Sequence, residues 1–219
     1  MTSARSPSQQ YAQTQPQTLT SESHVVVCGT VRSIKDTEAA LLVSQTIFVD
    51  CEGVNLGVYG GTLSILSLGV IPRDSPQRLN IYLIDVSCLS RALLSPIFDV
   101  LMSPKVTKVL WDGRMDYSAL YHGFGVRMRN VIDLQVVDIL SRESRDTPEQ
   151  HLQRFSGYVR ANLLRGSNSR RRYAGLHRLN SLLCAVKEHR PARYKQFKKD
   201  KGKLEFLEKS IVLLTLYYV

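Results

Sequence analysis

Residues 46–57 read TIFVDCEGVNLG, and the fold prediction starts from this stretch. Its first five residues are rich in β-branched and aromatic side chains, which is typical of a β-strand. Residues 63–70 (LSILSLGV) and 81–85 (IYLID) are two more strand-like runs, separated from their neighbours by Gly- or Pro-containing connections. The sequence therefore predicts three consecutive strands.

After residue 85 the pattern changes to an alternation of helices and strands. Apolar periodicity predicts helices over 91–102 and 114–124 and strands over 106–111 and 131–134. A further helix is predicted to follow the second of these strands and to end at about residue 140. Consecutive strands followed by such alternation predict an α/β fold with a sheet of mixed direction. We also expect a helix over 36–43, with Asp36 or Thr37 as its N-cap, and an amphipathic helix over 176–186.

The composition predicts the limits of the folded domain. Residues 1–22 are rich in Ser, Thr, Gln and Pro and lack periodicity, so we expect a disordered tail. The domain is predicted over 35–210, with a basic insertion or loop over 145–173 and an atypical apolar end over 211–219. No secretory signal and no apolar stretch of about 18 residues is present, so we expect an intracellular protein, nuclear or cytoplasmic, that does not span a membrane. The four cysteines lack C-x-x-C spacing and are interpreted as buried thiols.

The formal net charge of +10 is concentrated in the last third of the chain. Residues 36–140 hold 8 basic and 11 acidic residues, whereas residues 141–219 hold 18 basic and 7 acidic ones. A basic excess of this kind indicates a polyanionic partner, nucleic acid first and an anionic membrane surface second. Candidate phosphate contacts are Arg127 and Arg129, in a loop expected close to the site, and Arg171, Arg172, Lys198 and Lys199. The alternative is that the basic end is only a solvated loop and helix face.

Asp50 and Glu52 are the first candidate site residues. They lie two apart at the end of a predicted strand, so their side chains share one face of the sheet. Two neighbouring carboxylates repel each other, and a hard divalent cation such as Mg²⁺ or Mn²⁺ explains their proximity at neutral pH. The alternative is that acids at the rim of a sheet are simply solvated.

Three further acids follow in residues 108–140. Asp116 lies in the first turn of a predicted helix, from which it can reach the same sheet edge. Asp112 is interpreted as the N-cap of that helix. Asp133, near the end of the next short strand, is expected to hold a neighbouring loop or to support a metal site.

These motifs resemble the 3′–5′ exonuclease domain of the DEDD superfamily. The segments that carry the likeness are FVDCEG, the strand ending in Asp85, and KVLWDGRMDYSALYHGFGVRMRNVIDLQ. The chain is most similar to the ribonuclease D-like and Werner-type group, which includes eukaryotic 3′–5′ exonuclease domain-containing proteins. The likeness covers residues 35–140 well and residues 174–210 weakly. It implies a ribonuclease H-like fold, in which helices flank a mixed sheet.

The resemblance also implies a chemistry and roles for individual residues. Asp50 and Glu52 match the first motif of the family and Asp116 the second, so these three are the expected catalytic residues and metal ligands. Asp133, with Asp112, is expected to support them. The implied reaction is hydrolysis of the phosphodiester bond at the 3′ end of DNA or RNA, with two divalent cations, Mg²⁺ or Mn²⁺.

The third motif of the family is absent from this sequence. That motif is a Tyr or His followed four residues later by an Asp, and neither His177, His189 nor Tyr194 has an Asp at that spacing. One interpretation is that the chain is a truncated or mis-spliced version of a longer exonuclease. The other is that the domain has lost catalysis and acts as a nucleic-acid-binding or scaffold module of the same fold.

Overall fold

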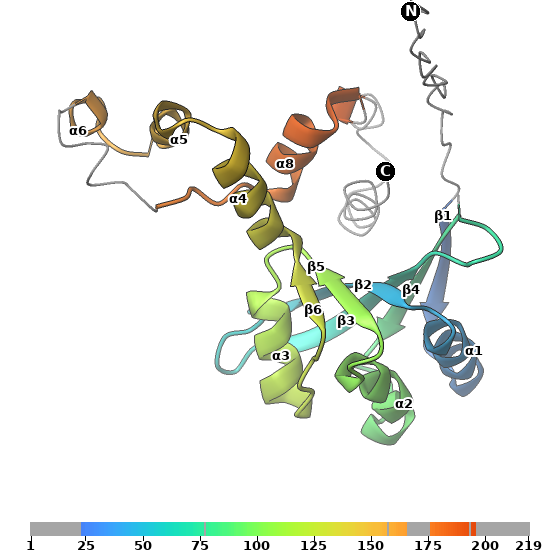
Figure 1. Cartoon of the computed structure of the whole chain (residues 1–219). Helices are drawn as coiled ribbons and strands as arrows, with labels where there is room; N and C mark the ends of the chain where they lie inside the picture. Colours follow the sequence, from blue (N-terminus) through green and yellow to red (C-terminus); the bar gives the residue numbers. More distant parts are fainter. Residues whose placement is uncertain (1–22, 77, 157, 166–175, 193, 196–219) are drawn as a thin grey trace, which may run out of the picture.

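A computed structural model describes residues 23–76, 78–156, 158–165, 176–192, 194 and 195. Within them a six-stranded sheet has the order β1-β4-β3-β2-β5-β6, and helices cover both of its faces (Figure 1). Strand β3 is antiparallel to β2 and β4, and the other neighbours are parallel. The predicted α/β class and mixed sheet are confirmed.

The strands are β1 (Ser23–Cys28), β2 (Thr46–Val54), β3 (Thr62–Val70), β4 (Leu79–Asp85), β5 (Thr107–Leu110) and β6 (Val131–Asp133). The helices are α1 (Val31–Leu42), α2 (Arg91–Met102), α3 (Arg114–Phe124), α4 (Leu134–Arg145), α5 (Pro148–Arg154), α6 (Ala161–Arg165) and α8 (Leu182–His189). Helices α2 and α3 have the predicted bounds, whereas β1 was not predicted.

Helix α1 begins earlier than its sequence pattern suggested. The predicted start at Asp36 is wrong, because Thr30 is the N-cap and its hydroxyl accepts the backbone N–H of Ser33. Ser33 reciprocates by accepting the N–H of Thr30, which completes a capping box. Asp36 therefore lies inside the helix, and the described residues begin with β1 at the edge of the sheet.

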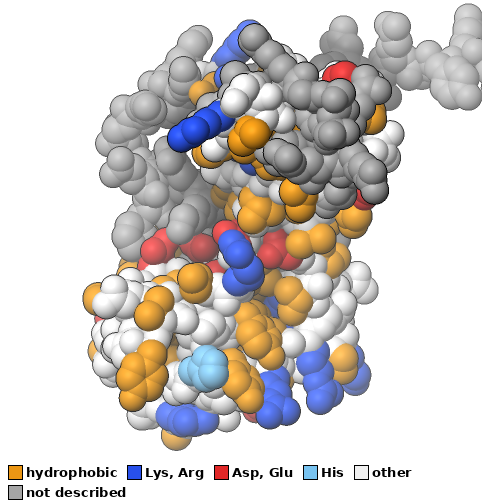
Figure 2. Space-filling view, turned by 90° about the vertical axis from the view of Figure 1, so that its left-hand side faces the viewer, with side chains coloured by type: hydrophobic (Ala, Val, Ile, Leu, Met, Phe, Trp, Pro, Cys, Tyr) orange, Lys and Arg blue, Asp and Glu red, His pale blue; other side chains and the backbone are white. Residues whose placement is uncertain are grey.

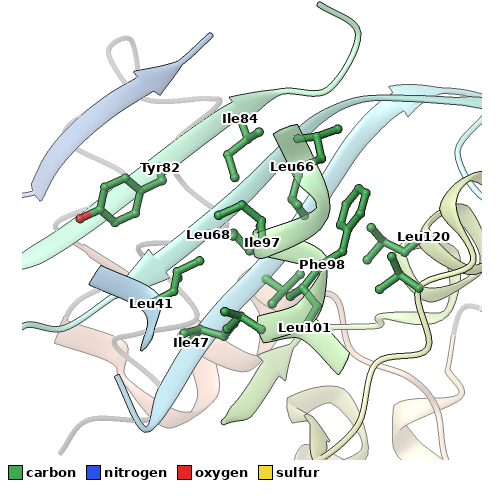
Figure 3. Packing of buried hydrophobic residues seen from close by; sticks show 14 of the residues in the cluster. Leu41, Ile47, Leu66, Leu68, Tyr82, Ile84, Ile97, Phe98, Leu101 and Leu120 are labelled. Atoms are coloured by element: carbon green, nitrogen blue, oxygen red, sulfur yellow. The ribbon is translucent and has the colours of Figure 1, made fainter. Parts of the chain in front are cut away.

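Helices α1, α2 and α3 pack on one face of the sheet and enclose the larger core. Figure 3 shows Leu41 of α1, Ile97 and Leu101 of α2, and Leu120 of α3 directed at strand residues such as Leu66. All five side chains are buried completely. This core fixes the position of α3 against β2 and β3, which the site described below requires.

A smaller core lies on the opposite face, on the side of α4 and α8. Phe48, Ile81 and Val109 of the sheet contact Leu134 of α4, and Leu182 of α8 packs against them. Figure 1 shows α4, α5, α6 and α8 on this side of the sheet. The two faces of the sheet are therefore covered by different halves of the chain.

Residues 141–165 are more regular than the predicted loop. Of the insertion or loop predicted over 145–173, the residues described up to 165 therefore include two short helices, α5 and α6, after α4 ends at Arg145. The predicted helix over 176–186 is displaced, because Ser181 is the N-cap of α8 and accepts the N–H of Cys184. Residues 1–22, 166–175 and 211–219 lie outside the described residues.

The cysteines divide into two pairs. Cys28 and Cys51 are buried as predicted, whereas Cys88 and Cys184 are exposed, so the interpretation of four buried thiols is wrong for the second pair. None of the helices within the described ranges combines the length and the apolar character needed to cross a membrane.

Candidate active site

The end of β2 carries two acidic side chains on one face of the sheet. Cys51 belongs to the core beneath α1–α3, whereas Phe48 belongs to the core on the α4 side. Because side chains alternate along a strand, Asp50 and Glu52 point to the same side as Phe48. The ladder between β2 and β3 is regular as far as Glu52 and shifts only between Glu52 and Gly53. The shared face predicted for the two acids is confirmed.

Asp116 joins α3 to this strand. Its carboxylate Oδ1 accepts the backbone N–H of Cys51 at 2.7 Å, and the side chain is buried to 7% exposure. Strand β5 pairs with β2 only from Thr46 to Phe48, so the carboxylate binds the amide beyond the point where this pairing ends. Asp116 therefore reaches the sheet edge beside Asp50 and Glu52, as the sequence predicted.

The thiol of Cys51 experiences the charge of all three carboxylates. Burial raises the pKa of Cys51 well above its usual range, and the negative charges of Asp116, Asp50 and Glu52 raise it further. The two motifs thus create one region of negative potential at the end of β2, formed by Asp50, Glu52 and Asp116 and here called the acidic rim. Such a region attracts cations.

Asp133 holds the turn that leads into α3. Its two carboxylate oxygens accept the backbone N–H groups of Asp112 and Gly113, both at 3.0 Å, and Oδ1 also accepts the N–H of Gln135 at 2.9 Å. Asp112 has a φ of 55°, in the left-handed region that non-glycine residues rarely adopt. The carboxylate stabilises this strained turn and caps α4 at once, so Asp133 holds a neighbouring loop as expected.

Asp112 does not cap α3, and that prediction is wrong. The N-cap residue is Gly113, which provides no side-chain cap. The carboxylate of Asp112 instead accepts two hydrogen bonds from Arg114, at 2.6 Å from Nε and 3.1 Å from Nη2. The left-handed backbone of Asp112 and the fork of the guanidinium favour this pair over a cap.

Arg114 is a cation beside Asp112 and Asp133 that sequence reasoning missed. Its side chain is 71% exposed, and its hydrogen bonds with Asp112, together with the charges of Asp112 and Asp133, raise its pKa. Figure 2 shows a band of acidic side chains at mid-height on this face, with a basic side chain across it. The arginine two residues before Asp116 in DGRMD was the available signal.

The loop between β2 and β3 contacts the start of α3. Gly57 has a φ of 72°, and a Cβ there would lie 2.8 Å from the Cα of Met115. The carbonyl of Gly57 also accepts the hydroxyl of Ser118 at 2.8 Å. A side chain at position 57 would push the loop away from the helix that carries Asp116.

The donor chemistry of the rim suits a hard cation, since it consists of carboxylate oxygens. Within the described part of the chain, however, no three His, Cys, Asp or Glu side chains are grouped so that they could hold a metal ion. One oxygen of Asp116 accepts the Cys51 amide. The residue types thus fit Mg²⁺ or Mn²⁺.

A comparison with protein families decides the membership of this chain. A family model described as 3′-5′ exonuclease matches residues 28–204. The chain belongs to the 3′–5′ exonuclease domain family. The resemblance inferred from the DEDD motifs is confirmed by this match.

The exonuclease domain is similar to proteins of Caenorhabditis elegans and Trypanosoma brucei. It is 37% identical to the Egalitarian protein homolog of Caenorhabditis elegans over 97 residues. These residues make up 44% of this chain and 16% of that protein. It shares its fold with Trypanosoma brucei RNase D in a GMP complex, at 20% identity and a TM-score of 0.51, over 88% of this chain and 55% of the other. It also matches the complex of that enzyme with RNA U12, at 18% identity and a TM-score of 0.50, over 90% of this chain and 63% of the other. The chain thus spans less than two thirds of the length of each.

The structure places two of the predicted phosphate contacts away from the acidic rim. Arg127 and Arg129 follow the C-terminal end of α3, whereas Asp116 lies in its first turn. The N–H of Arg129 bonds the carbonyl of Leu101, at the end of α2. The expectation that this loop lies close to the carboxylates is therefore wrong. Arg171, Arg172, Lys198 and Lys199 lie outside the described residues.

His189 contacts a carboxylate in the folded structure, although no Asp follows it at the four-residue spacing of the third motif. Its Nε2 lies 2.9 Å from Oδ1 of Asp138, a buried residue of α4. The other oxygen of Asp138 accepts bonds from Arg142, which is buried completely, and from Asn180. This cluster, here called the α4–α8 network, ties α8 to α4. Sequence reasoning missed Asp138 and Arg142 because both occur in an ordinary amphipathic helix.

Proposed function

We propose that this chain is a metal-dependent 3′–5′ exonuclease that releases nucleotides from the 3′ end of DNA or RNA. The observation that carries the proposal is the bond from Cys51 to Asp116, which brings the second-motif acid to the strand of Asp50 and Glu52. The family match supports the reaction class. The relatives of this fold bound to GMP and to RNA U12 support nucleic acid as the substrate.

Asp50, Glu52 and Asp116 are the residues that would hold the cations, two Mg²⁺ or Mn²⁺ ions. When bound, such ions supply an activated water and stabilise the charge on the leaving oxygen. Asp116 presents its carboxylate from a fixed position, because the Cys51 amide and the surrounding core restrain it.

Asp133 and Arg114 are positioning residues in this proposal. Asp133 fixes the β5–α3 turn through two backbone amides, and the turn sets the direction of α3 and hence of Asp116. The guanidinium of Arg114 is largely exposed and paired with Asp112, and its remaining N–H groups can bind a phosphate. A positive group at that point offsets part of the repulsion between the acidic rim and a polyanion.

The test follows the shortening of a 5′-labelled single-stranded oligonucleotide in Mn²⁺ or Mg²⁺. We expect a ladder of products one nucleotide apart, its loss in EDTA, and a rate at least a hundredfold lower for Asp50→Asn. Asp36→Asn is the matched control, because Asp36 is an exposed acid of α1 far from the rim in the fold. Absence of shortening by the wild-type chain, or equal rates for wild type and Asp50→Asn, contradicts the proposal.

A second candidate is a nucleic-acid-binding module of the same fold that no longer cleaves. It is favoured by the missing third motif and by the lack of a three-ligand group among the residues described. This candidate predicts salt-dependent binding of oligonucleotides without shortening, and equal affinity for wild type and Asp50→Asn. The basic residues Arg171, Arg172, Lys198 and Lys199 would contribute to the salt dependence in either case.

A further inference from the structure

Helix α3 carries two stacked tyrosines on its outer side, of which Tyr117 is exposed and Tyr121 is partly buried. The rings of Tyr117 and Tyr121 are 6.0 Å apart between centroids and are inclined by only 8°. The exposed His122 meets the Tyr121 ring edge-on at 5.0 Å. Tyr117 is 39% exposed although it is a large aromatic residue. The outer surface of this helix is therefore an aromatic strip.

An arginine extends the strip beyond the helix. The guanidinium of Arg127 lies 5.4 Å from the centre of the Tyr121 ring, and its Nη2 donates to the Tyr121 hydroxyl at 3.3 Å. Arg127 is exposed, so this cation remains available to a ligand. Aromatic faces interleaved with arginine are the surface on which unpaired bases stack and phosphates bind.

The charge around the strip matches a polyanion. Residues 114–130 contain three arginines, Arg114, Arg127 and Arg129, and all three are exposed. The same residues contain a single acid, Asp116, which is buried and bonded to Cys51. Arg114 is paired with the neighbouring Asp112, so the positive charge available to a phosphate lies beyond the C-terminal end of α3, at Arg127 and Arg129.

The strip begins next to the acidic rim. Tyr117 directly follows Asp116 in α3, Tyr121 lies one turn further along the helix, and Arg127 follows the C-terminal end. At 1.5 Å per residue, Tyr121 lies about 7–8 Å along the axis from Asp116. A strand whose 3′ end lies at the rim can therefore continue along α3 with its next bases over the tyrosines. Figure 2 shows hydrophobic side chains and a histidine below the acidic band on this face.

The two tyrosines also have a local role that must be separated from binding. Aromatic pairs four residues apart stabilise a helix by about 0.2–0.5 kcal/mol. That role needs neither the exposure of the rings nor the arginine over Tyr121. It also predicts a small change in stability on substitution and no change in the affinity for any ligand.

We propose that Tyr117, Tyr121 and Arg127 form a stacking surface for single-stranded nucleic acid upstream of the 3′ end. The direction of the strand rests on the proposed function, whereas the binding itself does not. The surface recognises unpaired bases through ring faces and one phosphate through the guanidinium. It therefore prefers single strands to duplexes and has little base specificity.

The test is the affinity for a fluorescent 12-nucleotide single-stranded RNA, measured by anisotropy in EDTA so that the strand stays intact. We expect Tyr117→Ala and Tyr121→Ala each to weaken binding about tenfold, and the corresponding Phe variants to keep the wild-type affinity. Arg127→Ala should lower the slope of log affinity against log salt by about one. A duplex of the same sequence should compete poorly with the single strand.

Two controls keep the result interpretable. Tyr158→Ala removes an exposed tyrosine that lies under its own arginine, Arg178, outside the α3 strip, and it should leave the affinity unchanged. The thermal midpoint of each variant shows whether the helix remains folded. The stacking surface is overturned if the folded Ala variants bind RNA with wild-type affinity, or if the wild-type chain binds no RNA. Either result is also expected if the strip contacts another protein instead.

The outcomes for the two proposals are separable. Unchanged RNA affinity in the tyrosine variants, together with shortening that depends on Asp50, overturns the stacking surface and leaves the exonuclease. Weaker binding by the tyrosine variants, without any shortening in Mn²⁺, leaves the stacking surface and overturns the exonuclease.

Discussion

The carboxylate of Asp116 accepts the backbone N–H of Cys51 at 2.7 Å, across 65 residues of sequence. The bond has two consequences. It satisfies a buried amide beyond the last residue of β2 that pairs with β5, and it places an acid of α3 at the rim that holds Asp50 and Glu52. Structure and proposed chemistry therefore depend on the same side chain, and substitutions can separate them.

Asp116→Ala should lower the free energy of unfolding by about 2 kcal/mol, because the buried Cys51 amide loses a charge-assisted partner. Asp116→Asn keeps an acceptor oxygen and should cost less than half as much, while it removes the charge needed for cation binding. Urea denaturation measures both values, with Asp99→Ala, an exposed acid of α2, as control. Equal stability of the Ala and Asn variants would contradict a role of the bond in stability.

Asp133→Ala should destabilise the protein by about 2–4 kcal/mol, since three backbone amides lose their acceptor and the left-handed turn at Asp112 loses its support. Asp85→Ala is the matched control, because Asp85 also ends a strand but is bonded by residues only two and three positions away, Ser87 and Cys88. Thermal unfolding distinguishes the two. A loss of stability no larger than that of the Asp85→Ala control would show that the turn does not depend on the carboxylate of Asp133.

Asp138→Ala should cost about 3–5 kcal/mol, because it leaves the completely buried guanidinium of Arg142 without its carboxylate. We expect amide hydrogen exchange to accelerate first in α8, where His189 loses the same partner. Glu143→Ala, an exposed acid of the same helix, is the control. If exchange in α8 stays at the wild-type rate, the α4–α8 network does not hold α8 in place.

Lys108 should make stability depend on pH. Its ammonium is completely buried and donates to the carbonyls of Ser103 and Val106, and burial lowers its pKa from 10.5 to about 8. Between pH 8 and 10.5 the unfolded chain binds the proton and the folded chain does not, so a rise in pH stabilises the folded state.

The measurement is the difference in unfolding free energy between wild type and Lys108→Met, followed from pH 7.5 to 10.5. The wild type should gain up to about 3 kcal/mol relative to the variant across this range. The comparison cancels the titration of groups such as Cys51 and Tyr82, whose pKa values are raised. A constant difference across the range would mean that the folded chain keeps the proton on Lys108.

Several elements could be predicted because their signals are local. Alternating apolar residues predicted β3, and apolar residues three and four positions apart predicted α2 and α3 with their bounds. The two-residue spacing of Asp50 and Glu52 predicted that both lie on one face of the sheet. Helix α1 was misplaced at its start because two cap signals competed, and the capping box of Thr30 and Ser33 prevailed over Asp36.

The sequence by itself determined the class of fold and which acids end the strands, because backbone preference and side-chain direction depend on residues two to four positions away. The tertiary structure alone decided what those acids bind. Asp116 meets Cys51, Asp133 meets the turn at Asp112, and Asp138 meets His189, across 65, 21 and 51 residues. Such contacts depend on the order of strands in the sheet and on how helices pack over it, and no local pattern carries that information.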